Sequence, residues 1–326
     1  MLAYTFRRLV MFVPLAFGMA TISFCLLLFF PGDPAAVLLG DAATPEQIAQ
    51  TRANLRLDEP WLQRLGSYLW SLAHGDMGQS IFQRRPVADI ILERIGATLE
   101  LAIAAILIAV VVGLVLGIFA ALWRGTLIDV VLMFFAQIGI SMPVFWLGVM
   151  LVYLFAVSLG VLPAISRGGP LLPALGAAFV GDFALLKRAL SHLFLPALSL
   201  GLGQAAIISR LVRASVLDVM HEDFVRTARA KGLGRMRVLL VHVLRNALLP
   251  IVSVIGLRFG VLLAGAVLTE SIFAWPGLGQ LIITAVSQRD LPLIQGLLVT
   301  FALMFALVNL VVDLIYGLVD PRVEMG

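Results

Sequence analysis

Residues 101–123 read LAIAAILIAVVVGLVLGIFAALW, a run of 23 positions without a charged side chain. A helix rises about 1.5 Å per residue, so ~20 apolar residues cross the ~30 Å hydrocarbon core of a bilayer. The rest of the chain has the same character, because 61% of its 326 residues are hydrophobic and 13% are charged. No soluble core of this size could bury so much apolar surface. We therefore predict an integral membrane protein and exclude a cytosolic enzyme, a disordered chain and a coiled coil.

Six long apolar runs predict six transmembrane helices, and all are too long for the ~9–11-residue strands of a membrane barrel. The fold class that we predict is all-α. The runs cover residues 9–30, 101–123, 130–162, 189–209, 246–269 and 291–312. A shorter stretch, residues 170–186, contains Asp182 and several prolines and glycines, so we expect an interfacial or re-entrant piece there.

The distribution of basic residues predicts the orientation. Eight basic residues lie between the fourth and fifth runs, opposed only by Asp218, Glu222 and Asp223: Arg210, Arg213, Arg226, Arg229, Lys231, Arg235, Arg237 and Arg245. Basic loops stay in the cytoplasm, so both termini are predicted to lie inside. We expect one transmembrane domain over residues 1–326, with segments 31–96 and 163–188 outside and segment 210–249 inside. The positive-inside rule also accounts for the net charge of +4 without a nucleic-acid partner.

Residues for catalysis, cofactor binding or metal binding are not evident. Neither Lys187 nor Lys231 is followed by Ser or Thr, as a phosphate-binding P-loop requires. The four histidines are scattered and Cys25 is the only cysteine, which disfavours a metal site. Ser141 in a Gly-x-Ser sequence suggests an intramembrane serine protease, but the last run contains no histidine to act as its base. We therefore expect a chain that is not itself an enzyme.

Charged residues inside predicted spans are candidates for a transport path, because such charges face cavities or form pairs. Arg258 lies mid-span in the fifth run, and Glu270 lies at the outer end of the same helix. Both could line a translocation path, in which Arg258 would attract a substrate carboxylate. The alternative is a structural ion pair between Arg258 and Asp313 of the sixth run.

The basic cytoplasmic loop has the pattern of an amphipathic helix, a break and a second helix. Four apolar residues recur at helical spacing and predict one apolar stripe: Leu217, Met220, Phe224 and Ala228. Gly232 and Gly234 then end the helix, and a second helix is predicted from Arg235 towards Pro250. Such an element could lie on an anionic lipid surface or dock on a soluble partner.

This loop resembles the EAA loop of ABC importer permeases, in which E-A-A is followed by a glycine and then by I-x-L-P. Ala228, Gly232 and Leu244 match in register, whereas Arg226 replaces the glutamate and Arg245 replaces a proline. The matching segments contain the predicted coupling residues Arg226, Thr227, Ala228, Arg229, Ala230, Lys231, Gly232, Leu244 and Arg245.

Other short motifs resemble the dipeptide, oligopeptide and nickel branch of the same family, and particularly its B-type subunits. In chain order they are PGDP at 31–34, LDEP at 57–60, GDMGQS at 75–80, SMP at 141–143, ESIF at 270–273, WPGLG at 275–279 and YGLVDP at 316–321. Each motif is weak alone, but their common order extends the resemblance over almost the whole chain.

The resemblance implies a type I ABC importer permease in the bacterial inner membrane. Its implied partners are a second homologous permease, two P-loop ATPase subunits and an extracytoplasmic substrate-binding protein. The coupling loop would transmit ATPase movement to the spans. The implied cargo is a di- or oligopeptide, with nickel or glutathione as alternatives. A secondary transporter without an ATPase partner is an alternative of another class, but its spans would need ion-coupling residues beyond Arg258, Glu270 and Asp313.

Overall fold

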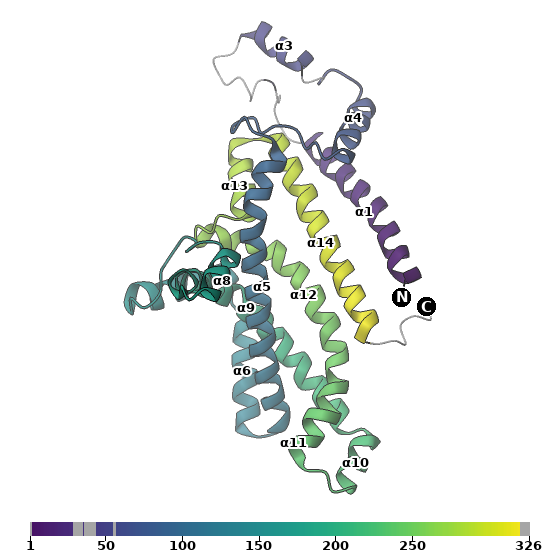
Figure 1. The fold of residues 1–326 in the computed structure, drawn as a ribbon, viewed down its shortest axis with the longest axis vertical. Coiled ribbons are helices and arrows are strands. Elements are labelled where there is room, and N and C mark those ends of the chain that lie inside the picture. Colours follow the sequence, from purple (N-terminus) through teal and green to yellow (C-terminus); the bar gives the residue numbers. More distant parts are fainter. Residues whose placement is uncertain (1, 29–34, 36–43, 55–56, 320–326) are drawn as a thin grey trace. The chain divides into compact units, whose positions relative to one another are not determined.

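A computed structural model of the chain describes residues 2–28, 35, 44–54 and 57–319 (Figure 1). In this part the regular structure is helical, and the β-bridge between Gln79 and Pro86 is isolated. The all-α prediction is therefore confirmed. The PGDP motif at 31–34 and the last two residues of the YGLVDP motif lie outside the described residues.

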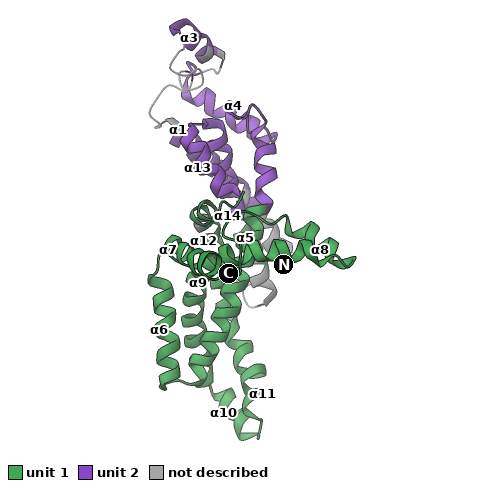
Figure 2. Cartoon of the chain, turned by 90° about the vertical axis from the view of Figure 1, so that its left-hand side faces the viewer, with its two compact units in different colours: residues 1, 97–276, 308–326 green, residues 2–96, 277–307 purple. Residues whose placement is uncertain are grey.

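The described chain forms two compact units, which Figure 2 distinguishes by colour. Unit 1 contains residues 97–276 and the chain from 308 onward, whereas unit 2 contains residues 2–96 and 277–307. Two long helices, α5 (Val87–Leu122) and α14 (Leu291–Val319), contribute residues to both units.

Helix α9 (Phe183–Met220) is the central helix of unit 1. It contacts α6 (Leu127–Ser141), α7 (Val144–Leu151), α8 (Leu171–Phe179) and α12 (Leu244–Ile272), and α5 packs on it as well. The 38 residues of α9 span roughly 57 Å, which is far longer than the ~30 Å that a bilayer core requires. The helix therefore extends beyond the apolar stretch at 189–209, and its basic C-terminal turns are part of it.

Helices α5 and α9 approach closely at glycines. A Cβ atom on Gly117 would lie 2.5 Å from the backbone oxygen of Ser209, and one on Gly113 would lie 2.7 Å from the Ile208 side chain. From the other side, a Cβ on Gly201 would lie 2.6 Å from the backbone oxygen of Ala105. Small residues allow this contact between membrane helices. The Gly-x-x-x-Gly pair at 113 and 117 therefore serves helix packing.

The third apolar run, residues 130–162, contains a bent pair of helices and not one straight helix. Helix α6 ends at Ser141, Met142 is extended, and α7 starts after Pro143 at an angle of 106° to α6. The residue before a proline is disfavoured in the helical region, which explains the break. Helix α7 continues as a π-helix, η1 (Val152–Ser158).

The described residues of unit 2 include four further helices: α1 (Leu2–Leu28), α3 (Pro45–Asn54), α4 (Trp61–Ala73) and α13 (Leu278–Gln288). Helices α1 and α4 meet where the Phe24 and Tyr68 rings lie 5.7 Å apart. Burial raises the pKa of Tyr68 to about 12, so this phenol stays neutral. The buried carboxylate of Asp290 accepts hydrogen bonds from Ser80 Oγ at 2.5 Å and the Ile81 N–H at 3.2 Å. It joins the start of α14 to the GDMGQS motif.

Among the described residues, three helical segments are long and apolar enough to cross a bilayer alone: α5, α9 and residues 291–312 of α14. Two bent pairs, α6 with α7–η1 and residues 235–248 with 250–263, bring the number of candidate spans to five. In α1 the apolar stretch is Val13–Leu26. Helix α8 has nine residues and is too short to span, in agreement with an interfacial piece. The count of six and the orientation stay predictions.

Candidate functional site

The basic loop forms a helix, a break and a second helix, as predicted. Helix α10 (Asp223–Ala230) follows the end of α9, and the break at 231–234 contains Gly232 with φ +80°. The chain resumes as α11 (Arg235–Arg237) and the π-helix η2 (Val238–Val243), which lead into α12. A positive φ is strained for any side chain, so glycine at 232 allows the sharp turn.

Helix α10 is anchored by Val225 and Ala228, which are 0% and 6% exposed. They belong to an apolar cluster with residues of α5, α9, η2 and α12, including Val212, Val216, Val238, Val243, Ala247 and Ile251. Burying one valine stabilises such a contact by about 1.5–3 kcal/mol. The loop therefore shares one apolar core with α5, α9 and α12.

The predicted single stripe through Leu217, Met220, Phe224 and Ala228 is wrong. Helix α9 ends at Met220, the chain turns at His221 and Glu222, and Phe224 is 42% exposed. The turn shifts the phase of α10, so Val225 is the residue that is buried beside Ala228. Helical spacing across 217–228 could not reveal this turn, because no glycine or proline marks it.

The outer face of the loop combines cations with apolar side chains. Its exposed members are Phe224, Arg226, Arg229, Lys231, Arg235, Met236, Arg237 and Leu240. We call these residues the loop face. Within the described part of the chain, no carboxylate forms an ion pair with these cations. Aromatic, Met and Arg side chains are enriched in protein interfaces, and helices that lie on anionic lipid also combine cations with apolar side chains. The composition of the loop face therefore fits both a protein partner and a lipid surface.

A hollow of about 530 Å³ lies beside the loop face. Its lining comes from the ends of α5 and α9 and from both halves of the loop: Leu122, Met220, Arg229, Leu233, Arg235, Val238, Leu239 and Val243. Arg229 and Arg235 thus border a concavity with apolar walls, in which a protruding side chain of a partner could be held.

The other predicted coupling residues have different surroundings. The Thr227 hydroxyl donates a hydrogen bond to the Asp223 carbonyl at 3.0 Å, and Ala230 is exposed at the end of α10. Leu244 is half-buried against the apolar cluster, and Arg245 is exposed one position further along α12. The structure therefore brings the matching residues to one loop but divides them into anchors and exposed groups.

An ion pair that sequence reasoning missed joins α6 to α9 near this loop. Arg213 Nε and Nη2 donate to the two oxygens of Asp129 at 2.7 Å each, and the Gly125 N–H donates to the same carboxylate at 3.0 Å. Asp129 is 5% exposed. Paired Arg–carboxylate hydrogen bonds fix geometry as well as charge. From the sequence, Arg213 is only one of the basic residues that predict the orientation. Asp129 lies one residue before the predicted third span, so it is not among the charges considered inside spans.

A second missed ion pair lies in unit 1 at the other end of α5. Arg167 Nη2 donates to Glu100 at 2.6 Å, and the Arg167 guanidinium lies 5.9 Å from the Trp275 ring centroid. The Trp275 indole N–H donates to the Ala97 carbonyl at 2.8 Å. The tryptophan of the WPGLG motif is therefore a buried structural anchor. No sequence pattern relates Glu100 to Arg167, which are 67 positions apart.

The two residues predicted for a translocation path lie in different surroundings. Glu270 has no exposed surface, and the Thr98 hydroxyl donates to it at 2.7 Å. Arg258 is half-buried on α12. Close to it, a Cβ on Gly256 would lie 2.2 Å from the Val312 side chain, so α12 and α14 cross there. The side chain of Asp313 is outside the described residues, and the choice between path and ion pair for Arg258 stays open.

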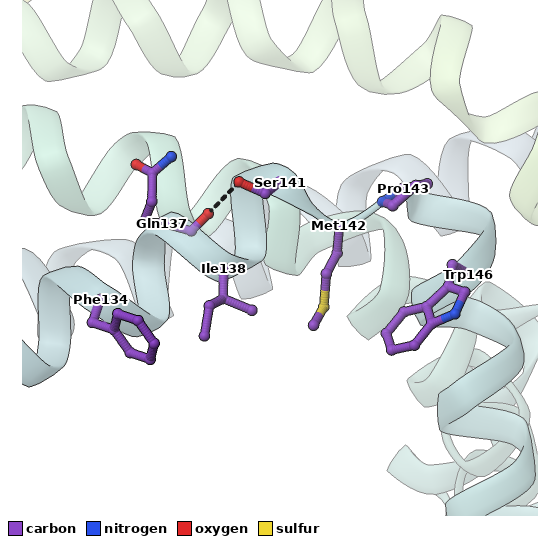
Figure 3. Close-up of a pocket in the computed structure, with 7 residues that line it drawn as sticks. All are labelled: Phe134, Gln137, Ile138, Ser141, Met142, Pro143 and Trp146. Carbon is purple, nitrogen blue, oxygen red and sulfur yellow. Dashed lines mark hydrogen bonds between the residues drawn. The ribbon is translucent and has the colours of Figure 1, made fainter.

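The bend between α6 and α7 forms a groove of about 420 Å³ (Figure 3). Phe134, Ile138, Met142 and Trp146 project to one side of the bend, whereas Gln137 and Ser141 lie along its other edge. Pro143 completes the lining. Arg210 of α9 donates a hydrogen bond to the Gln137 side-chain oxygen at 3.3 Å. The groove thus has an apolar floor, a polar edge and a cation beside that edge.

Among the described residues, no group of three His, Cys, Asp or Glu side chains is placed to hold a metal ion.

Comparison with known proteins gives matches along the chain. Residues 113–325 match the family described as "Binding-protein-dependent transport system inner membrane component", and residues 1–102 match the N-terminal part of such membrane components.

Three relatives match over almost their whole length. The chain is 43% identical to the dipeptide transport system permease protein DppB of Escherichia coli K12, and 44% identical to the di/tripeptide transport system permease protein DppB of Pseudomonas aeruginosa UCBPP-PA14. It is 40% identical to the glutathione transport system permease protein GsiC of Escherichia coli O6:H1. Each alignment covers 99% of this chain and 99% of the relative.

A solved structure shares the fold. The inward-facing MetNI methionine ABC transporter matches with a TM-score of 0.53 and 20% identity, over 71% of this chain and 96% of the other. The chain therefore has the helical fold of an ABC importer permease.

Proposed function

Because the chain belongs to the binding-protein-dependent transport system inner membrane components, we propose that it is the pore-forming subunit of an ATP-driven importer of di- and oligopeptides. Full-length identities of 43% and 44% to dipeptide and di/tripeptide permeases support the peptide cargo. The whole chain would form one permease domain, with residues 31–96 and 163–188 outside the cell and residues 210–249 in the cytoplasm.

The proposed partners are those that the resemblance to ABC importer permeases implies. The chain has no P-loop sequence, and the resemblance assigns ATP hydrolysis to two separate ATPase subunits. A second permease of the same family would complete the pore, and an extracytoplasmic binding protein would deliver the peptide.

The observation that carries the coupling role is the construction of the loop. Val225 and Ala228 fix α10 in a core shared with α5, α9 and α12, while the loop face is exposed. An ATPase that holds the loop face therefore moves three long helices when it closes on nucleotide. Since a helix displaced with its core transmits the motion to its neighbours, the loop converts closure into a change of access.

The test is purification of the chain in a mild detergent, with identification of the proteins that accompany it. We expect a second permease of this family and P-loop ATPases, and we expect the reconstituted assembly to take up a labelled dipeptide only with ATP and the binding protein. A chain that purifies alone and transports without ATP would establish a secondary transporter.

Charge reversal tests the docking surface within that assembly. Arg229→Glu on the loop face should reduce both recovery of the ATPases and ATP-driven uptake, because the reversed charge opposes a partner that matches a basic surface. The matched control is Lys187→Glu, an exposed cation in segment 163–188. Equal recovery of ATPases with both variants would contradict the docking role.

Glutathione is a second candidate cargo, favoured by the 40% identity to a glutathione permease over 99% of the chain. Uptake of labelled dipeptide and of labelled glutathione by the same reconstituted assembly decides between them. Uptake of glutathione without dipeptide would reassign the cargo and leave the importer role intact. Nickel remains the third candidate, and uptake of the radioactive ion in parallel would reveal it.

A further inference from the structure

The bend between α6 and α7 is an unusual place for a membrane protein to expose its backbone. Pro143 has no N–H, so the carbonyl of Gly139 receives no helical hydrogen bond from the position four residues later. Ser141 and Pro143 are both exposed. Non-helical backbone at membrane depth is tolerated where protein covers it or where it lines a water-filled cavity. The bend falls within the predicted third span, residues 130–162, so in that span the exposed bend would need one of these two environments.

The shape of the bend favours the cavity. The groove of about 420 Å³ falls within the ~300–1,000 Å³ range of small-molecule sites, and it combines apolar walls with few polar groups, as such sites do. Its apolar floor consists of Phe134, Ile138, Met142 and Trp146, which project to the same side (Figure 3). This floor offers aromatic and thioether contacts to an apolar side chain of varied shape.

The positive charge of Arg210 beside the groove favours an anionic group on a ligand whose apolar side chain lies on the floor. Arg210 reaches the polar edge through its hydrogen bond to Gln137. The seven residues that line the groove include no carboxylate, and among the described residues none pairs with Arg210. The nearby Arg213 is already neutralised by Asp129. An anionic group at the polar edge would therefore meet an uncompensated guanidinium, which binds carboxylates through paired hydrogen bonds.

We propose that this groove is a binding site for the C-terminal end of a peptide in transit: Arg210 and Gln137 receive the terminal carboxylate, and the floor of Phe134, Ile138, Met142 and Trp146 receives the last side chain. The proposal rests on the proposed function of peptide import. It names a site within the path, and it explains why a span is broken at Pro143.

The experiment uses the complete reconstituted importer and a single engineered thiol. Cys25→Ser removes the only native cysteine of the chain, and Ser141→Cys places a thiol at the polar edge of the groove. The matched control is Phe135→Cys, which lies on the same helix, is 63% exposed and does not line the groove. A charged, membrane-impermeant thiol reagent reports on water access, and the two probes are Ala-Phe and its C-terminal amide.

We expect the thiol at 141 to react at least about tenfold faster than the thiol at 135, because the groove holds water. Saturating Ala-Phe should slow the reaction at 141 about tenfold, and the amide should protect much less, since it lacks the carboxylate. Arg210→Gln should remove the difference between the two probes, and Arg210→Lys should retain part of it. If Ser141→Cys prevents assembly, Gln137→Cys in the same background carries the measurement.

Three outcomes would overturn the site. A thiol at 141 that reacts in the isolated chain but not in the importer would assign the groove to an interface with the second permease. A reactive thiol that neither probe protects, in an importer that still takes up Ala-Phe with ATP, would leave a water-filled bend without a binding site. Absence of ATP-driven uptake of Ala-Phe in the Cys25→Ser parent importer, together with absence of protection at 141, would refute the proposed function itself, and the site with it.

Discussion

At the scale of single residues, buried charges hold the helices of unit 1 at defined points. The carboxylate of Asp129 is satisfied by two hydrogen bonds from Arg213 and one from the Gly125 backbone. Glu100 accepts from Arg167 and from the Leu171 N–H. A buried charge that loses its partner is costly, because neither water nor another group replaces the lost hydrogen bonds. These residues are therefore sensitive positions although they lie outside the loop face.

Asp129→Asn tests the first of these pairs. It should lower the stability of unit 1 by about 2–3 kcal/mol, because the Arg213 guanidinium would keep a half-buried charge without its counterion. The measurement is the thermal unfolding midpoint of the purified importer. Glu93→Gln is the matched control, since it removes one member of an ion pair that is about half exposed on both sides. Equal changes in the midpoint would show that the Asp129–Arg213 pair stabilises the protein no more than an exposed ion pair does.

Gly232 and Gly234 form a matched pair for the loop backbone. Gly232→Pro should abolish the coupling of ATP hydrolysis to uptake, because proline requires φ near −65° and Gly232 has φ +80°. Gly234 has φ −61°, so Gly234→Pro should be tolerated. The measurement is the number of peptides imported per ATP hydrolysed, with the amount of membrane-inserted protein checked for both variants. Normal coupling in Gly232→Pro would mean that the turn does not position α10.

At the scale of helices, the sequence predicted where helices occur better than where they bend or end. Apolar runs located the helices because a bilayer demands ~20 apolar residues from any spanning segment, whatever surrounds it. The angle of 106° between α6 and α7 was not predictable, since Pro143 permits a break but the contacts of α7 with α9 and α12 set its direction. The end of α9 at Met220 was likewise hidden, and with it the burial of Val225.

In the candidate site too, the sequence predicted some features and missed others. Motif order identified the loop at 226–250, and Gly232 was recognised as its turn. The ion pairs Asp129–Arg213 and Glu100–Arg167 were missed, because partners 84 and 67 positions apart become neighbours only through helix packing.

Packing of α5 on α9 gives a prediction at this scale. Gly117→Val should destabilise unit 1 by about 3 kcal/mol or more, because its Cβ would lie 2.5 Å from a backbone oxygen of α9 that cannot rotate away. Gly96→Val is the matched control, since Gly96 lies on the same helix and a Cβ there meets no atom within 4 Å. Thermal unfolding of both variants measures the effect. A Gly117→Val protein as stable as Gly96→Val would contradict the close α5–α9 contact.

At the scale of the whole molecule, the charges on the chain determine how it crosses the membrane. The loop face and its neighbours contain the largest group of basic residues, and translocating such a loop across the membrane is disfavoured. Segments 31–96 and 163–188 should then be on the opposite side. Helix α8 is decisive, because a seventh span at 170–186 would place the basic loop outside the cell. With six spans, the basic loop would lie in the cytoplasm, where the proposed ATPase partners would meet it.

Three cysteine variants in the Cys25→Ser background test this orientation. Leu62→Cys on α4, Phe179→Cys on α8 and Met236→Cys on the loop face replace side chains that are 62%, 92% and 64% exposed. An impermeant thiol reagent should label the first two in spheroplasts, whereas Met236→Cys should be labelled only in inverted vesicles. Labelling of residue 236 from outside would reverse the orientation and remove any route to a cytoplasmic ATPase. Six spans place two crossings between α4 and α8, so residues 62 and 179 should be labelled from the same side. Labelling of residue 179 from inside and of residue 62 from outside would mean an odd number of crossings between them, and therefore a span count other than six.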